Sequence, residues 1–241
     1  MPETQPRILL LDIETKPALA YTFGIRDQHI TYKQLMPGQH GGTICVGVGW
    51  HGEKTVKVYS DWDHGHREML ERVHALLDEA DAVCTYNGAR FDLPKLNGEF
   101  MLAGMPPPAP PTQIDVFKTV RKMGLISSKL DYIAPALGLG GKVKHEGLEM
   151  WIAVMNGDPK AQRKMARYCA GDVRLLGQVY ERIKPYILDH PHLKDRRADF
   201  CAQCGSNNLE NRGWRRTKAF RIARVQCRSC GGWSTGRREA A

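Results

Sequence analysis

The apolar run at residues 7–15, Arg-Ile-Leu-Leu-Leu-Asp-Ile-Glu-Thr, constrains the fold more than any other stretch of the sequence. Its length and composition predict a buried central strand, yet it carries Asp12 and Glu14. Residues i and i+2 of a strand point to the same face, so these carboxylates should lie side by side. Two anions this close resist burial unless a cation lies between them. A site for Mg²⁺ or Mn²⁺ is one interpretation, and a strand that runs out into solvent is the simpler alternative.

Length and composition describe an ordinary globular chain. The 241 residues, 42% hydrophobic and 25% charged, can form one ample core and a small second unit. No apolar run approaches the roughly 20 residues that cross a bilayer, and the N-terminal residues lack the pattern of a signal peptide. We therefore expect a cytoplasmic protein without membrane contact.

The positive charge is concentrated near the C-terminus. Residues 195–241 contain 11 Lys and Arg against 4 Asp and Glu, a net charge of +7 out of the total of +9. A nearly neutral body with a basic tail predicts a polyanionic partner that the tail holds. Nucleic acid is the favoured partner, and an anionic membrane surface is the weaker alternative.

The order of predicted elements indicates an α/β fold with a mixed sheet flanked by helices. Residues 44–50 and 55–59 form a predicted hairpin, and further strands are expected at 82–86 and 113–117. Helical spacing predicts helices at 67–80, 93–103, 130–137, 148–155 and 159–183, with a short helix near 31–35. The proline-rich residues 105–111 are expected to be a stiff connector, although they could instead bind a proline-recognising domain. We expect a domain at 1–188, a polar linker at 189–198 and a small domain at 199–241.

Other carboxylates follow in the chain. Asp92 comes after a predicted strand at the start of a helix, where it could also act as a simple helix cap. Tyr168 and Asp172 are spaced i, i+4 on the last long helix and therefore share a face. Gly171 beside them costs this helix about 1 kcal/mol relative to Ala. Such a glycine suggests that another segment must approach the helix closely here.

Three blocks thus occur in order: Asp-x-Glu on a first strand, Asn-x-x-x-Phe-Asp after a later strand, and Tyr-x-x-x-Asp on a late helix. Over residues 7–186 the chain resembles the DEDDy branch of the RNase H-like 3′–5′ exonucleases, which is related to the proofreading domains of family-B DNA polymerases. Residue 167 is Arg, where the histidine branch of that family would have His.

The resemblance implies an RNase H-like fold and a two-metal site for Mg²⁺ or Mn²⁺. Its metal-site carboxylates would be Asp12, Glu14, Asp92 and Asp172, and Tyr168 would orient the attacking water. Asn87 and Phe91 would support the site and contact the terminal nucleotide. We expect Asp12 to bridge both ions, with Glu14 and Asp172 on the water-activating ion and Asp92 on the other.

Two Cys-x-x-Cys pairs lie near the C-terminus, formed by Cys201, Cys204, Cys227 and Cys230. Their spacing, with a glycine after each pair, resembles a zinc ribbon and predicts one tetrahedral Zn²⁺. Unligated thiols or disulfides are the alternatives. The other three cysteines stand singly among apolar neighbours, as reduced core thiols do.

The segment between the cysteine pairs mixes aromatic and basic side chains. Aromatic rings can stack on bases while cations follow phosphates, so this segment is a candidate nucleic-acid contact. The candidate residues are Trp214, Arg215, Arg216, Lys218, Phe220, Arg221 and Arg224. The alternative is that Trp214, Phe220 and Trp233 merely form the core of a small domain.

The favoured function is a metal-dependent 3′–5′ exonuclease that acts on single-stranded DNA, with the zinc ribbon holding the strand. The alternatives are a structure-selective endonuclease, an RNA exonuclease and a non-catalytic nucleic-acid-binding module. A protein-binding role for the ribbon, towards replication or repair proteins, also stays open.

Overall fold

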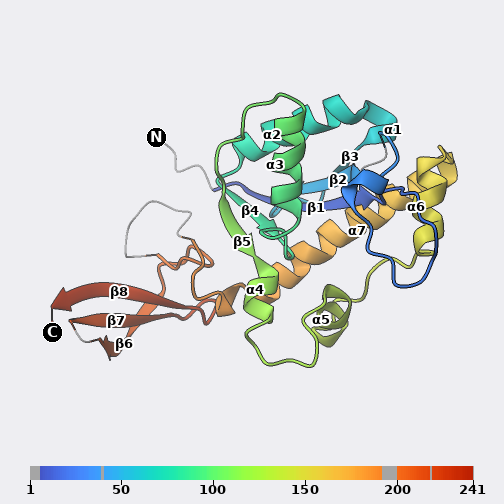
Figure 1. Ribbon diagram of the computed structural model, residues 1–241. Coiled ribbons are helices and arrows are strands. Elements are labelled where there is room, and N and C mark those ends of the chain that lie inside the picture. Colours follow the sequence, from blue (N-terminus) through green and yellow to red (C-terminus); the bar gives the residue numbers. More distant parts are fainter. Residues whose placement is uncertain (1–5, 39–40, 192–199, 218, 241) are drawn as a thin grey trace.

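The computed structural model describes residues 6–38, 41–191, 200–217 and 219–240, which contain a five-stranded and a three-stranded sheet (Figure 1). The large sheet consists of β1 (Ile8–Lys16), β2 (Gly42–Trp50), β3 (Val56–Ser60), β4 (Ala82–Thr85) and β5 (Thr112–Asp115). The small sheet consists of β6 (Leu209–Arg216), β7 (Phe220–Cys227) and β8 (Trp233–Ala240). The α-helices are α1 (Asp61–His64), α2 (His66–Glu79), α3 (Asp92–Leu102), α4 (Val116–Val120), α5 (Leu130–Ala136), α6 (Leu148–Met155) and α7 (Pro159–Ile183). Two 3₁₀ turns, Tyr32–Gln34 and Lys184–Tyr186, complete the described elements.

Strand β1 is the centre of the large sheet, whose strand order is β3-β2-β1-β4-β5. It pairs antiparallel with β2 and parallel with β4, so the sheet is mixed, as the sequence predicts. The predicted hairpin is formed by β2 and β3. None of the described helices is long and apolar enough to span a bilayer.

Alternate residues of β1 face two different helical layers. Leu9, Leu11 and Ile13 pack in a cluster with α2 and α3, which cover one face of the sheet (Figure 1). Ile8 and Leu10 pack in a second cluster with α4, α5 and α7 on the other face. Because side chains alternate along a strand, the even-numbered residues that follow, Asp12 and Glu14, also point toward α7.

Helix α7 lies unusually close to the sheet at Gly47, the β2 residue opposite Asp12. A Cβ atom at Gly47 would be 2.8 Å from both the Cys169 Sγ and the Val173 Cγ2 of α7. Glycine therefore permits a contact between strand and helix that any larger residue would push apart. This contact brings the middle of α7 toward the carboxylate end of β1.

Three details differ from the sequence predictions. The strand expected at 113–117 ends at Asp115, because the Asp115 side chain accepts a hydrogen bond from the Phe117 amide and starts α4. Helix α3 begins at Asp92 with Phe91 in the cap position, so Asp92 is not the helix cap. The single-turn helix α1 is too short for helical periodicity to reveal it.

The small sheet buries few apolar side chains. Cys201, Ala223 and Cys227 are its buried apolar residues within the described residues 200–217 and 219–240. Trp214 is 37% exposed, and Phe220 and Trp233 are only partly buried, so these aromatic residues do not form the compact core that was the alternative interpretation. Most of the predicted linker at 189–198 lies outside the described residues, as does Lys218.

Candidate active site

Three of the four predicted carboxylates converge between β1 and α7. One carboxylate oxygen from each of Asp12, Glu14 and Asp172 lies within 4.8 Å of the other two. The register of β1 places Asp12 opposite Gly47 and Glu14 opposite Cys45, over which α7 packs. Asp172 is buried, and no hydrogen bond reaches its Oδ1 atom from any described residue. The cluster therefore gathers several carboxylate oxygens, of which the buried Asp172 Oδ1 has no hydrogen-bond partner among the described residues.

Burial and the repulsion of nearby charges raise the pKa values of Asp12 and Glu14. Burial raises the pKa of Asp12 well above its usual range, and the nearby charges of Asp92, Glu14 and Asp172 add to this shift. Burial and the charge of Asp172 raise the pKa of Glu14 from 4.5 to about 8. A raised carboxylate pKa means that the ionised form lacks compensating positive charge. A bound cation would supply that charge.

Asp92 lies beside this cluster but is not one of the three close-set ligands. It is buried at the first turn of α3, and its Oδ1 accepts a 3.1 Å hydrogen bond from the Ile13 amide of β1. Burial raises its pKa to about 6, although that hydrogen bond lowers it. Of the charges near Asp12, that of Asp92 has the largest effect on the Asp12 pKa, so the two carboxylates share one electrostatic environment.

Tyr168 lies one helical turn before Asp172 and is 7% exposed. Its ring makes edge contacts with His145 at 4.8 Å and with Trp151 at 6.2 Å between centroids, which fix its direction. Burial, and then the charge of Asp172, raise the pKa of the Tyr168 phenol above its usual range. The phenol is therefore protonated at neutral pH and can donate a hydrogen bond, but it is a poor base.

Lys142 is a component of the cluster that the sequence analysis did not identify. Its Nζ donates to Asp172 Oδ2 at 2.6 Å and to the Tyr168 hydroxyl at 3.4 Å. Burial lowers the pKa of Lys142, but the hydrogen bond and charge of Asp172 outweigh this effect and raise it. The signal that could have found Lys142 is Gly171, because a Cβ there would lie 2.9 Å from the Val143 Cγ2. Gly171 therefore leaves space for Val143, the chain neighbour of Lys142, to pack closely against α7.

Asn87 and Phe91 lie in the turn between β4 and α3. Asn87 has a left-handed backbone conformation with φ of 70°, which Asn tolerates better than most residues. The carboxylate of the buried Asp115 in β5 accepts hydrogen bonds from the backbone amides of Asn87, at 2.8 Å, and of Ala89, at 3.4 Å. The Phe91 side chain is 49% exposed. Asp115 therefore holds this turn in place, a role that the sequence analysis missed.

The cluster fits a divalent metal site by its own chemistry. It offers the oxygen ligands that Mg²⁺ and Mn²⁺ prefer, with one buried oxygen of Asp172 unsatisfied among the described residues. The raised pKa values of Asp12, Glu14 and Asp92 show that the chain by itself stabilises their charges poorly. Lys142 compensates one negative charge and leaves the others.

The four cysteines form a second cluster that fits Zn²⁺. Their sulfur atoms lie close together, with Cys201 and Cys230 Sγ 3.6 Å apart and Cys204 and Cys227 Sγ 3.7 Å apart. Zinc–sulfur bonds of about 2.3 Å in a tetrahedron place the sulfur atoms roughly 3.8 Å apart, so the spacing matches. Disulfide bonds would be much shorter, and all four thiols are free. The glycines that follow each pair have positive φ and close the tight turns, as the sequence predicts.

The predicted nucleic-acid contacts of the small sheet are surface residues. Trp214, Arg215, Arg216, Arg221 and Arg224 are exposed, whereas Phe220 is partly buried. Arg221 stacks over the Trp214 ring at 4.7 Å. The sheet lies beyond the C-terminal end of α7 in Figure 1. The structure thus divides the candidate residues between a buried cluster and an exposed basic surface.

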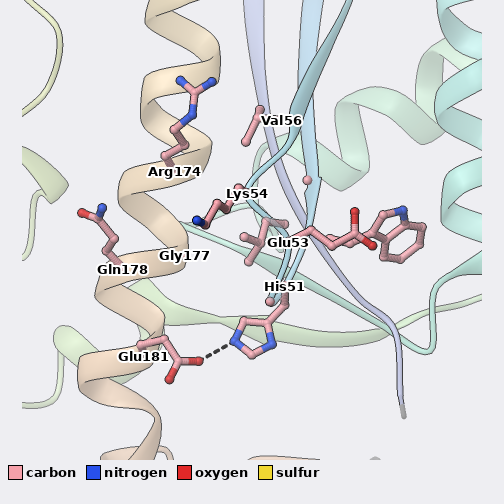
Figure 2. A pocket seen from close by; sticks show the side chains of 12 residues that line it. His51, Glu53, Lys54, Val56, Arg174, Gly177, Gln178 and Glu181 are labelled. Carbon is pink, nitrogen blue, oxygen red and sulfur yellow. Dashed lines mark hydrogen bonds and ion pairs between the residues drawn. The ribbon is translucent and has the colours of Figure 1, made fainter. Parts of the chain in front are cut away.

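A pocket of about 550 Å³ lies elsewhere, between the β2–β3 turn and α7 (Figure 2). Arg174, Gln178 and Glu181 line it from the helix, and the ring Nε2 of His51 in the turn contacts the Glu181 carboxylate. None of the predicted site residues lines this pocket. It is therefore separate from the carboxylate cluster.

Comparisons with known proteins agree with this architecture. A family model described as the RNase H superfamily matches residues 33–184, which include Asp92, Tyr168 and Asp172. The family-B DNA polymerase of the hyperthermophilic archaeon Pyrobaculum calidifontis has a similar structure over 76% of this chain, with a TM-score of 0.56 and 17% sequence identity. The matched region is 25% of that polymerase chain, and at 17% identity the likeness concerns the fold alone. A search of curated proteins gives no match. The expected RNase H-like sheet is confirmed.

Proposed function

We propose that this chain, which belongs to the RNase H superfamily, is a metal-dependent nuclease that removes nucleotides from the 3′ end of single-stranded DNA. The observation that carries the proposal is the convergence of Asp12, Glu14 and Asp172 within 4.8 Å of one another. Lys142 pairs with Asp172 but leaves Asp12 and Glu14 without an ion pair in the described chain, and a merely structural role does not account for this. The order of the sequence blocks supports the exonuclease class.

In this proposal the side chains of the protein hold the metal ions and orient the attacking water, and divalent metal supplies the chemistry. Bound Mg²⁺ or Mn²⁺ lowers the pKa of water and stabilises the charge that develops on the departing 3′-oxygen. Asp12 would be shared between two ions, Glu14 and Asp172 would hold one, and Asp92 would reach the other. Tyr168 would hydrogen-bond the attacking water and direct it at the phosphorus.

The substrate end is proposed to lie against the β4–α3 turn. Asn87 and the exposed Phe91 ring would contact the terminal nucleotide, with Asp115 holding their turn to β5. One face of the small sheet would bind the strand further from the cut. We propose the corresponding organisation as a catalytic domain at 1–188, a linker at 189–198 and a zinc-binding domain at 199–241.

Digestion of end-labelled oligonucleotides tests this function. A 5′-labelled single-stranded DNA should shorten one nucleotide at a time with Mg²⁺ or Mn²⁺ and remain intact without them. A strand blocked at its 3′ end and a circular strand should resist. Cutting of the circular strand would establish the endonuclease alternative, and faster digestion of the matching RNA would make RNA the substrate. If none of these strands is cut in a metal-dependent way, the nuclease proposal is overturned.

A further inference from the structure

The two faces of the small sheet carry different sets of side chains. Residues directly opposite in neighbouring antiparallel strands point to the same face. Arg215 of β6 is opposite Ile222 of β7, which is opposite Arg238 of β8. Phe220 and Arg224 lie two residues from Ile222 on β7 and so share its face.

We name this set the arginine face; its members are Arg215, Phe220, Ile222, Arg224, Trp233 and Arg238. Trp233 belongs to it because it is opposite Gln226, two residues beyond Arg224. The guanidinium of Arg238 lies 3.4 Å from the Phe220 ring centroid, and that of Arg224 lies 5.1 Å from the Trp233 ring centroid. Each aromatic ring of this face thus lies beneath a cation.

The cations of the arginine face are not neutralised. Arg215, Arg224 and Arg238 are exposed, and none of them forms an ion pair with any carboxylate of the described chain. Glu210, which lies opposite Gln226, is already paired with Arg212 and Arg228 near the zinc end of the sheet. Three free guanidinium groups therefore remain along this face.

The opposite face carries a carboxylate that pairs with two of its three arginines. Arg216, Arg221 and Glu239 are opposite one another there, and the Glu239 carboxylate binds both Arg221 and Arg237. Trp214 lies on this face beneath Arg221. A ligand phosphate would have to compete with Glu239 for Arg221 and Arg237, whereas Arg216 forms no ion pair with any carboxylate of the described chain.

We propose that the arginine face, and not the opposite face, binds a single-stranded nucleic acid. Planar guanidinium groups contact phosphates through two hydrogen bonds, and they also stack on bases. The guanidinium groups that lie over Phe220 and Trp233 offer stacking surfaces at two places about 20 Å apart along the sheet, because the two rings are six strand residues apart. An exposed, uncompensated cation paired with an aromatic ring is the arrangement that single-strand binders use. The choice of ligand rests on the proposed nuclease function.

Two matched double variants test this assignment in the full chain carrying Asp12→Asn, which prevents cutting. Arg224→Ala with Arg238→Ala removes two charges from the arginine face, and Arg221→Ala with Arg237→Ala removes two charges from the opposite face. Binding of fluorescent 15-nucleotide oligo-dT and oligo-rU is measured by anisotropy at several salt concentrations. One zinc per chain, measured in each variant, shows that the sheet is intact.

We expect the double substitution on the arginine face to weaken binding at least about 10-fold. The slope of log affinity against log salt concentration should become shallower by about 1.4. The control pair should change affinity less than about 3-fold. Equal losses in both pairs would show that only bulk charge matters, and would overturn the proposal. Wild-type affinity in both pairs, or no binding of either oligonucleotide, would overturn it as well. If the face effect holds but the wild-type chain never cuts, the proposed nuclease function fails while the binding face stands.

Discussion

The carboxylate cluster and the four-cysteine cluster both gather like-charged ligands, but the surrounding chain differs. Asp12, Glu14 and Asp172 lie on β1 and α7, which a large apolar cluster holds together. The four cysteines join turns of a sheet whose buried apolar residues, in the described part, are Cys201, Ala223 and Cys227. The first site can therefore keep its shape without metal and is strained by its own charge. The second site, by contrast, is expected to fold only when metal is bound.

Zinc removal should have the largest effect, and it should affect the small sheet but not the large one. Structural zinc contributes roughly 10–16 kcal/mol to small cysteine sites, far more than the small sheet can replace. Cys227→Ser should unfold residues 200–240 while the large sheet stays folded, as amide hydrogen exchange measured by mass spectrometry can show. Withdrawal of Mg²⁺ should leave both regions protected. Slow exchange in β7 of the zinc-free variant would contradict the account.

Tyr168→Phe separates the positioning of water from the binding of metal within the carboxylate site. This change keeps the ring contacts with His145 and Trp151 but removes the hydroxyl. Because the phenol is proposed to direct water and not to bind metal, activity should fall about 10- to 100-fold, with Mn²⁺ affinity unchanged. Titration of turnover against Mn²⁺ separates the two quantities. A shifted Mn²⁺ midpoint at unchanged maximal rate would argue against a positioning role.

Gly47→Ala tests whether close packing of α7 sets the carboxylate geometry. The added methyl would meet Cys169 and Val173 at 2.8 Å, and overpacking of this kind costs about 1–3 kcal/mol. Stability measured by urea unfolding should fall, together with activity. Gly98→Ala is the control, because its Cβ meets nothing within 4 Å in helix α3 and should stabilise by about 0.5–1 kcal/mol. Equal stability of both variants would remove the packing argument.

The metal-free protein should lose stability as pH rises. The pKa of Glu14 is raised from 4.5 to about 8, and that of Asp92 to about 6, so the folded state binds protons more tightly than the unfolded state. The resulting stability is present below pH 4.5 and is lost as pH rises toward 8. Allowing for solvent near the partly exposed Glu14, we expect a loss of roughly 1–2 kcal/mol, or a Tm lower by about 2–8 °C. Added Mg²⁺ should reverse this at pH 8; a Tm that rises with pH in its absence would contradict the sign.

The sequence predicted the parts of the site that regular elements carry. Asp12 and Glu14 share a face because strands alternate, and Tyr168 and Asp172 share one because helices repeat. Lys142 could not be predicted in this way, since it lies 30 residues before Asp172 in an irregular segment. The sequence pattern predicts only an ordinary strand residue at Asp115 for the same reason: its partners in the β4–α3 turn lie 26 and 28 residues away. Periodicity finds side chains that share an element, and it does not find contacts between loops.

Hydrolysis by Asp12→Asn tests the central claim, that the β1–α7 carboxylates form a metal-dependent catalytic site. The variant is compared with wild type and with Asp131→Asn, which removes an exposed carboxylate of α5. With Mg²⁺ and single-stranded DNA, Asp12→Asn should be at least about 1000-fold slower, whereas Asp131→Asn should match wild type. Without metal, Asp12→Asn should be as stable as wild type or more so, because it removes one of several repelling charges. Wild-type turnover by a folded Asp12→Asn protein would contradict the account.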